Sequence, residues 1–113
     1  MVGQVSAGAR PQREGIPLAL ADARDAIDAI DDQIVDLLVQ RLAVVKNVVI
    51  VKEREGIPAL LPDRVEEVVE RVGLRAAAAG LPPDLTERVW RDLIEWTIAY
   101  EDKHLGEARS SDE

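Results

Sequence analysis

The sequence has no cysteine, no phenylalanine and a single histidine, His104. The lack of cysteine excludes a disulfide framework and thiolate chemistry, and one histidine cannot form a histidine-cluster metal site. Two tryptophans and one tyrosine are the only aromatic residues, although 47% of the residues are hydrophobic. The core must therefore be built largely from aliphatic side chains.

Positive charge is also scarce, with 14 Lys and Arg against 22 Asp and Glu, for a formal net charge of −8. This balance argues against nucleic-acid binding, because clustered Lys and Arg are needed to neutralise phosphates. No apolar run reaches the roughly 18 residues of a membrane span. Residues 1–15 also lack the apolar stretch of a signal peptide. We expect one cytoplasmic domain that contacts neither nucleic acid nor membrane.

The two ends of the chain differ in composition from its middle. Residues 1–17 are polar and glycine-rich without a period, and residues 107–113 are polar as well. Both compositions are typical of flexible tails. The sequence therefore predicts one helical domain over residues 18–106.

The first part of this domain has the periodicity of a single long helix. Neither Gly nor Pro occurs from Leu18 to Glu55, which predicts a helix about 50 Å long. Gly56 and Pro58 predict its end. Apolar residues recur along it at steps of three and four, namely Ile27, Ile30, Ile34, Leu37, Leu38, Leu42, Val45, Val48 and Val49.

Two shorter helices are predicted after a loop at residues 57–62. Asp63 can cap the second helix, which runs to Gly80. Pro83 suits the first turn of the third helix, which is expected to end near Gly106. The fold class is therefore all-α, with one long helix and two shorter ones. The long helix cannot bury its apolar stripe against two helices of about half its length, and a large exposed patch is typical of an interface. We therefore expect an intertwined homodimer.

Two basic residues lie beside the apolar stripe of the long helix. Arg41 and Lys52 are eleven residues apart, so they point the same way with Cα atoms roughly 16 Å apart. Buried cations need a partner, and few acids lie on this stripe, which favours a small bound carboxylate. Long basic side chains also reach solvent from the edge of such a stripe. The pattern alone leaves both interpretations open.

The third helix carries a weaker signal. Thr97 and Glu101 are four residues apart and share a face with Leu93 and Ile94, so they could line a pocket or form a solvated edge. His104 is interpreted as interacting with the dipole at the expected helix end. The two tryptophans are expected in the core or at its rim.

Taken together, the polar positions form a specific pattern. Its members are Arg24, Ile27-Asp28-Ala29-Ile30-Asp31, Leu37-Leu38-Val39-Gln40-Arg41, Lys52, Pro62-Asp63-Arg64, Thr97 and Glu101. Over residues 20–106 their order and spacing resemble the all-helical chorismate mutase family. The resemblance implies three helices in an interlocked homodimer.

The resemblance also implies an enolpyruvyl dicarboxylate substrate. Arg41 and Lys52 are implied to bind its carboxylates and ether oxygen, together with the partner subunit's Arg24. Arg24 and Lys52 are about 42 Å apart along one helix, so one small ligand cannot touch both within a chain. By the same resemblance, the other residues of the substrate site are Arg64, Val65, Thr97 and Glu101.

Two features depart from the family pattern. Many members carry Glu where this chain has Val65, and an acid where Leu60 and Leu61 stand. In this respect the chain is similar to the isochorismate-pyruvate lyases and the 4-amino-4-deoxychorismate mutases, although the lyases usually carry Gln at the position of Glu101. The ring substituent of the substrate therefore stays open.

The implied activity is the Claisen rearrangement of chorismate, or of its 4-amino-4-deoxy analogue, without metal or other cofactor. Lys52, Arg41 and Glu101 would be catalytic, and Glu101 could donate to the ether oxygen only when protonated. One alternative is an isochorismate-pyruvate lyase that uses the same pericyclic site. The other is a non-catalytic helical dimer, against which the joint presence of all these polar residues argues.

Overall fold

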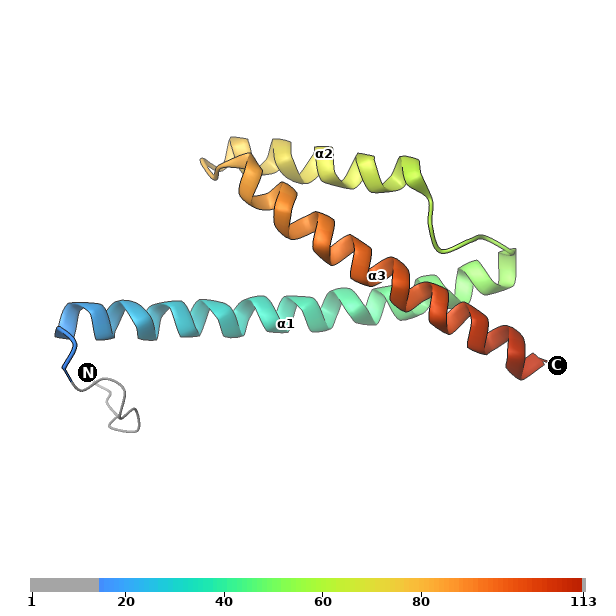
Figure 1. Ribbon diagram of the computed structural model, residues 1–113, viewed down its shortest axis with the longest axis horizontal. Helices are drawn as coiled ribbons and strands as arrows, with labels where there is room; N and C mark the ends of the chain where they lie inside the picture. Colours follow the sequence, from blue (N-terminus) through green and yellow to red (C-terminus); the bar gives the residue numbers. More distant parts are fainter. Residues whose placement is uncertain (1–14, 113) are drawn as a thin grey trace. The chain divides into compact units, whose positions relative to one another are not determined.

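A computed structural model describes residues 15–112, and the side chains of residues 15–106. It contains helices α1 (Leu18–Glu55), α2 (Pro62–Ala78) and α3 (Pro83–Asp112) (Figure 1). The described residues contain no strand, so the predicted all-α class with three helices is confirmed. Within this range, no helix has the length and apolar character that crossing a membrane requires.

The chain divides into two compact units, residues 1–40 and residues 41–113. The first contains the N-terminal part of α1, which begins at Leu18 as predicted. The second contains the rest of α1 with α2 and α3. Of the predicted N-terminal tail, residues 1–14 lie outside the described residues, and that prediction stays a prediction.

In the first unit, α1 carries a row of exposed aliphatic side chains. Ile27, Ile30, Ile34 and Leu37 are each between 50% and 61% exposed. They recur at steps of three and four, so they lie along one side of the helix. Four members of the predicted apolar stripe are thus exposed in a single chain, and the homodimer expected from this stripe stays a prediction.

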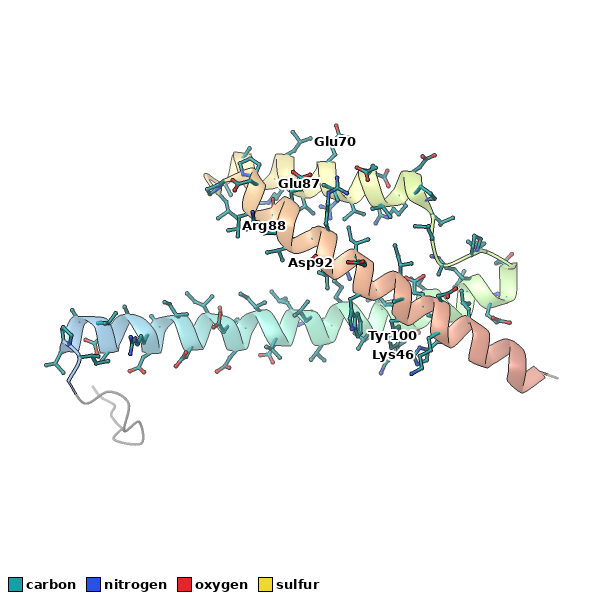
Figure 2. The ribbon with its side chains drawn as sticks, in the orientation of Figure 1. Lys46, Glu70, Glu87, Arg88, Asp92 and Tyr100 are labelled. Atoms are coloured by element: carbon teal, nitrogen blue, oxygen red, sulfur yellow. The ribbon has the colours of Figure 1, made fainter. Side chains whose placement is uncertain are left out.

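In the second unit, a first cluster of buried aliphatic side chains lies between α2 and α3. Figure 2 shows Glu70 projecting from the side of α2 turned away from α3, the polar side of an amphipathic helix. The buried residues of the cluster between α2 and α3 are Val68, Val69, Val72 and Ile94.

The two tryptophans differ in their burial. Trp90 is partly buried against the first cluster, whereas Trp96 is 54% exposed. The prediction of a position in the core or at its rim is therefore right for Trp90 alone.

A second cluster joins the end of α1 to the following loop and to α3. It consists of Val49, Ala59 and Leu105, of which Leu105 is only 2% exposed. At this end of α1, Gly56 has a φ of +72°, and the Ile57 amide donates to the Lys52 carbonyl at 2.9 Å. This is the glycine-dependent helix end that the sequence predicts at Gly56.

The start of α2 differs from the prediction that Asp63 caps it. Leu61 occupies the cap position without a side-chain hydrogen bond, and Asp63 lies inside the first turn. Pro62 begins the helix and has no amide hydrogen, so one of the donors that a cap would satisfy is missing. Asp63 instead places negative charge near the positive end of the helix dipole.

The predicted end of the third helix near Gly106 is wrong, because α3 continues to Asp112. Residues 107–112, expected in a flexible tail, are helical, and residue 113 lies outside the described residues. One glycine inside a helix costs only about 1 kcal/mol relative to alanine, and the buried Leu105 holds the preceding turn.

His104 therefore does not lie at a helix end, contrary to the interpretation from the sequence. Its Nδ1 donates to the carbonyl oxygen of Tyr100 at 2.8 Å. Its ring stacks on that of Tyr100 with the centroids 4.0 Å apart. His104 thus interacts with the helix turn that precedes it rather than with a terminal dipole.

Candidate functional site

Four polar side chains that the sequence singled out meet in two pairs within the second unit. The Arg41 guanidinium donates from Nη1 to the Thr97 hydroxyl oxygen at 3.0 Å. The Lys52 ammonium donates to Glu101 Oε1 at 2.8 Å. Arg41 and Lys52 lie in the C-terminal part of α1, and Thr97 and Glu101 are one turn apart on α3. Figure 1 shows α3 crossing the C-terminal part of α1. We call these four residues the polar cluster.

Lys52 is enclosed by the protein. Its side chain is 13% exposed and that of Glu101 is 8% exposed. Besides Glu101, its ammonium donates to the backbone carbonyl of Ala59 at 2.9 Å. An ammonium has three N–H donors, so one remains for a ligand.

Thr97 holds the guanidinium of Arg41. The Thr97 side chain is buried, and its hydroxyl donates to the Leu93 carbonyl at 2.7 Å while it accepts from Arg41. The hydroxyl proton is therefore already used inside α3. Arg41 has five N–H donors in a planar fork, so it keeps further donors that can pair with a carboxylate.

The electrostatics around Arg41 favour an additional anion. Burial lowers the pKa of its guanidinium, the nearby charge of Arg64 lowers it further, and Glu101 acts in the opposite direction. Arg64 is exposed and pairs with Glu67 at 2.7 Å. The polar cluster thus contains two cations, Arg41 and Lys52, and one acid, Glu101. A bound carboxylate would pair with the second cation.

Val65 does not belong to the polar cluster. It packs against the core between α2 and α3 and lines a pocket of about 200 Å³ together with Leu60, Arg91, Ile94, Glu95 and Ile98. None of the four cluster residues lines this pocket. Val65 therefore provides an apolar wall with no side-chain group that could bind a substrate hydroxyl.

Arg24 belongs to the first unit, where it is exposed on α1. Its predicted action across a dimer stays a prediction, since a single chain cannot test it. Within residues 15–112, no group of three or more His, Asp or Glu side chains is arranged to hold a metal ion.

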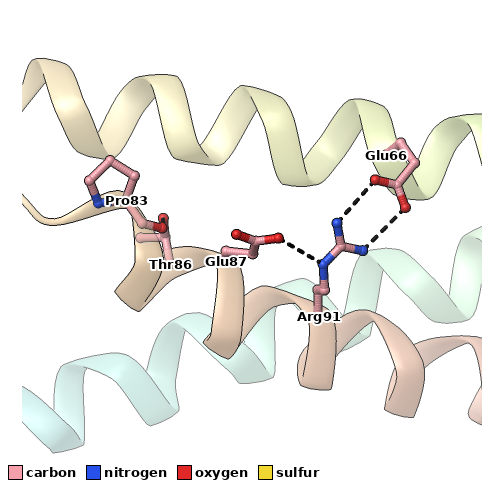
Figure 3. Close-up of polar contacts among 5 residues, drawn as sticks. All are labelled: Glu66, Pro83, Thr86, Glu87 and Arg91. Atoms are coloured by element: carbon pink, nitrogen blue, oxygen red, sulfur yellow. Dashed lines mark hydrogen bonds and ion pairs between the residues drawn. The ribbon is translucent and has the colours of Figure 1, made fainter.

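An exposed ion-pair network links α2 to α3, and the sequence did not indicate it. Arg91 donates to both carboxylate oxygens of Glu66 at 3.0 and 3.2 Å, and to Glu87 at 3.2 Å (Figure 3). The hydrogen bonds from Arg91 lower the pKa of Glu66, and those to Glu66 and Glu87 raise the pKa of Arg91. Because these groups are exposed, the network stabilises the packing of α2 on α3 only weakly.

The carbonyl of Ala59 is the other contact that sequence reasoning missed. It accepts from Lys52, so it helps to place that ammonium. Every residue has a backbone carbonyl, and no side-chain pattern marks the one that will face a lysine. The sequence therefore contained no signal for it.

Comparison with known proteins gives consistent matches. Residues 23–102 match the family model described as chorismate mutase type II. The chain is 40% identical to the T-protein of Enterobacter agglomerans over 75 residues, 66% of this chain and 20% of the T-protein.

Two shorter relatives align along most of their length. The chain is 28% identical to a chorismate mutase of Methanocaldococcus jannaschii over 91 residues, 80% of this chain and 92% of that protein. It is 36% identical to an isochorismate pyruvate lyase of Pseudomonas aeruginosa over 93 residues, 81% of this chain and 90% of the lyase. The chain thus spans about nine-tenths of these two relatives, but only about a fifth of the T-protein.

Proposed function

The chain belongs to the chorismate mutase type II family, and we propose that it rearranges chorismate to prephenate, or the 4-amino-4-deoxy analogue to the corresponding product, at the polar cluster. The observation that carries this proposal is the polar cluster itself, in which the partly buried Arg41 is held by Thr97 and the enclosed Lys52 is held by Glu101. Such a site is built for a small anion, and chorismate is a dicarboxylate.

The first task of the site is to hold the reactive conformer. The rearrangement requires the enolpyruvyl side chain to lie over the ring, so that the two reacting carbons approach. Arg41 clamps one carboxylate with the donors that Thr97 leaves available. The partner subunit's Arg24 clamps the other. Two fixed carboxylates define the conformation of the substrate between them.

The second task is to stabilise charge on the ether oxygen. In one step the C–O bond breaks, a C–C bond forms within the same molecule, and negative charge grows on the departing oxygen. The remaining N–H of Lys52 donates to that oxygen from one side, and Glu101 can donate from the other side only as a carboxylic acid. No nucleophile, redox change or net proton transfer is needed.

We also propose that the active form is a homodimer. The exposed row formed by Ile27, Ile30, Ile34 and Leu37 supplies an apolar surface for a second copy. An antiparallel partner helix would bring its Arg24 to the polar cluster, because Arg24 and Lys52 of one chain are 28 residues apart, about 42 Å along a helix. Each site is then completed by the neighbouring subunit.

A specific observation favours isochorismate-pyruvate lyase as the second candidate. The lyase of Pseudomonas aeruginosa is 36% identical over 90% of its length, and Val65 offers no acceptor for a ring hydroxyl. A lyase would bind a related dicarboxylate at the same cations and release pyruvate. Glu101 favours the mutase, because the lyases that the sequence resembles usually carry Gln at this position.

Product identification separates these functions. The purified protein is incubated separately with chorismate, isochorismate and 4-amino-4-deoxychorismate, and products are identified by proton NMR. We expect prephenate from chorismate, or the rearranged product from the amino analogue. Salicylate and pyruvate from isochorismate alone would instead assign the lyase. Lys52→Ala protein purified in the same way should be inactive, which excludes a contaminating enzyme.

A further inference from the structure

We propose that the Gly56–Leu61 loop positions Lys52 for the reaction, and that Leu105 anchors this loop from α3. The inference rests on the proposed function for its catalytic consequence. Its structural part rests only on contacts within the second unit. Neither Leu105 nor the Ala59 side chain needs to touch the substrate, so both would act through Lys52.

The loop starts from the backbone of Lys52 itself. Gly56 has a φ of +72°, which reverses the chain direction at the end of α1. The Ile57 amide then donates to the Lys52 carbonyl at 2.9 Å. The first turn of the loop is therefore tied to the residue whose side chain lies in the site.

The loop then returns to the side chain of Lys52. The Ala59 carbonyl accepts from the Lys52 ammonium at 2.9 Å, and Glu101 accepts at 2.8 Å. Two acceptors fixed by different elements, the loop and α3, determine the direction of the third N–H. A shift of the Ala59 carbonyl would reorient the donor that remains for the ether oxygen.

Packing holds the Ala59 carbonyl in place. Ala59 is 7% exposed, although it lies in a loop, and it belongs to the cluster with Val49 and Leu105. Leu105 is four residues after Glu101, so both lie on the same side of α3. This side of α3 thus contacts Lys52 directly through Glu101 and supports it indirectly through Leu105 and Ala59.

Two mild substitutions test this arrangement. Leu105→Val removes one methylene from the cluster, and Ala59→Gly removes the packed methyl but keeps the carbonyl. We expect each to lower kcat by about tenfold or more, because small misplacements of a catalytic group are costly. KM should change by less than about threefold, since the Arg41 clamp is intact.

A matched control separates positioning from general destabilisation. Val72→Ala opens a larger space, by two carbons rather than one, in the other cluster, between α2 and α3. It should lower Tm at least as much as Leu105→Val while keeping kcat within about twofold of the wild type. An equal fall of kcat in Val72→Ala would overturn the positioning role.

A spectroscopic measurement tests whether Ala59 and Leu105 position the Lys52 ammonium, and it does not depend on catalytic activity. Nitrogen-15 NMR of the lysine ammonium groups should show a slowly exchanging signal from Lys52, assigned by its loss in Lys52→Arg. Lys46 and Lys103, the other lysines, are exposed and should exchange fast. In Leu105→Val and Ala59→Gly the Lys52 signal should broaden or vanish, whereas Val72→Ala should keep it.

The outcomes are distinct. An unchanged Lys52 signal, or an unchanged kcat in both loop variants of an active enzyme, would overturn the inference. A Lys52 signal that depends on Leu105 in a protein inactive on all three substrates would instead overturn the proposed function and leave the positioning role intact.

Discussion

Lys52 and Glu101 form an enclosed ion pair between α1 and α3, with the ammonium nitrogen 2.8 Å from the carboxylate oxygen. In this pair the carboxylate accepts a hydrogen bond. The proposed reaction requires the opposite from Glu101, which can donate to the ether oxygen only as a carboxylic acid. Replacing Glu101 with glutamine, which can both accept from Lys52 and donate to the substrate, therefore separates these two roles.

Glu101→Gln should give an active enzyme with a flatter pH profile. Glutamine keeps a donor at every pH, and its amide oxygen can still accept from Lys52. In the wild type, Glu101 can donate only as a carboxylic acid. Steady-state kinetics between pH 5 and pH 8 should therefore show a weaker pH dependence of kcat in the variant than in the wild type.

Asp102→Asn is the control for this experiment. Asp102 is the exposed neighbour of Glu101 on α3, and its substitution removes the same charge. Its pH profile should follow that of the wild type. A folded Glu101→Gln protein that is inactive at every pH would show that Glu101 does not donate to the ether oxygen.

Glu66→Gln should lower Tm slightly at neutral pH without changing kcat. Arg91 holds the pKa of Glu66 below its usual value of 4.5. The contact between Glu66 and Arg91 therefore stabilises the fold above pH 4.5, and this stabilisation is lost as the pH falls through the lower folded-state pKa of Glu66. The difference in Tm should be at most about 3 °C for an exposed pair. It should shrink below about pH 4 and in high salt.

Glu70→Gln is the control for Glu66→Gln, because Glu70 lies on the same helix and projects away from α3 (Figure 2). Thermal unfolding followed by circular dichroism should show no comparable dependence on pH. If Glu66→Gln and Glu70→Gln behave alike, the contact with Arg91 does not contribute to the stability of the fold.

Helix boundaries could be predicted where local chemistry decides them. Gly56 ends α1 and Pro83 begins α3 as expected, because a positive φ and a missing amide hydrogen are properties of one residue. The end of α3 was predicted wrongly near Gly106, since the helix continues to Asp112. There the burial of Leu105 outweighs a small local penalty, and burial depends on residues far away in the sequence.

The sequence was enough to name the residues of the polar cluster, but not to predict which of them form hydrogen bonds with one another. The spacing of Arg41 and Lys52 on one helix indicated that they share a side. Which of them meets Thr97 and which meets Glu101 depends on how α3 crosses α1, which no local pattern specifies. The contact of Lys52 with the Ala59 carbonyl required the loop path as well.

The protein should sediment as a dimer at micromolar concentration. The proposed dimer buries the exposed row on α1, so Ile34→Glu, which places a charge in the middle of this row, should shift the equilibrium to monomers and lower activity. Analytical ultracentrifugation measures both states. A wild-type protein that is a folded, fully active monomer would contradict the shared site.

Mixing two inactive variants tests whether Arg24 acts across the interface. Arg24→Ala and Arg41→Ala dimers should each be nearly inactive. After joint unfolding and refolding, half of the dimers should be mixed and have one intact site, so about a quarter of the wild-type activity should return. No recovery above the separate variants, with mixed dimers verified by mass spectrometry, would exclude this role of Arg24.

The most direct test of the proposed site is the value of kcat/KM for chorismate in the Arg41→Ala variant. The Arg88→Ala variant, which removes an exposed arginine, serves as the control. Removing the carboxylate clamp should cost roughly 3 to 5 kcal/mol of transition-state binding, about a hundredfold to a few thousandfold in kcat/KM, with the helical circular dichroism spectrum unchanged. Arg88→Ala should stay within about twofold of the wild type. A folded Arg41→Ala protein with near-normal kcat/KM would mean that the reaction takes place elsewhere.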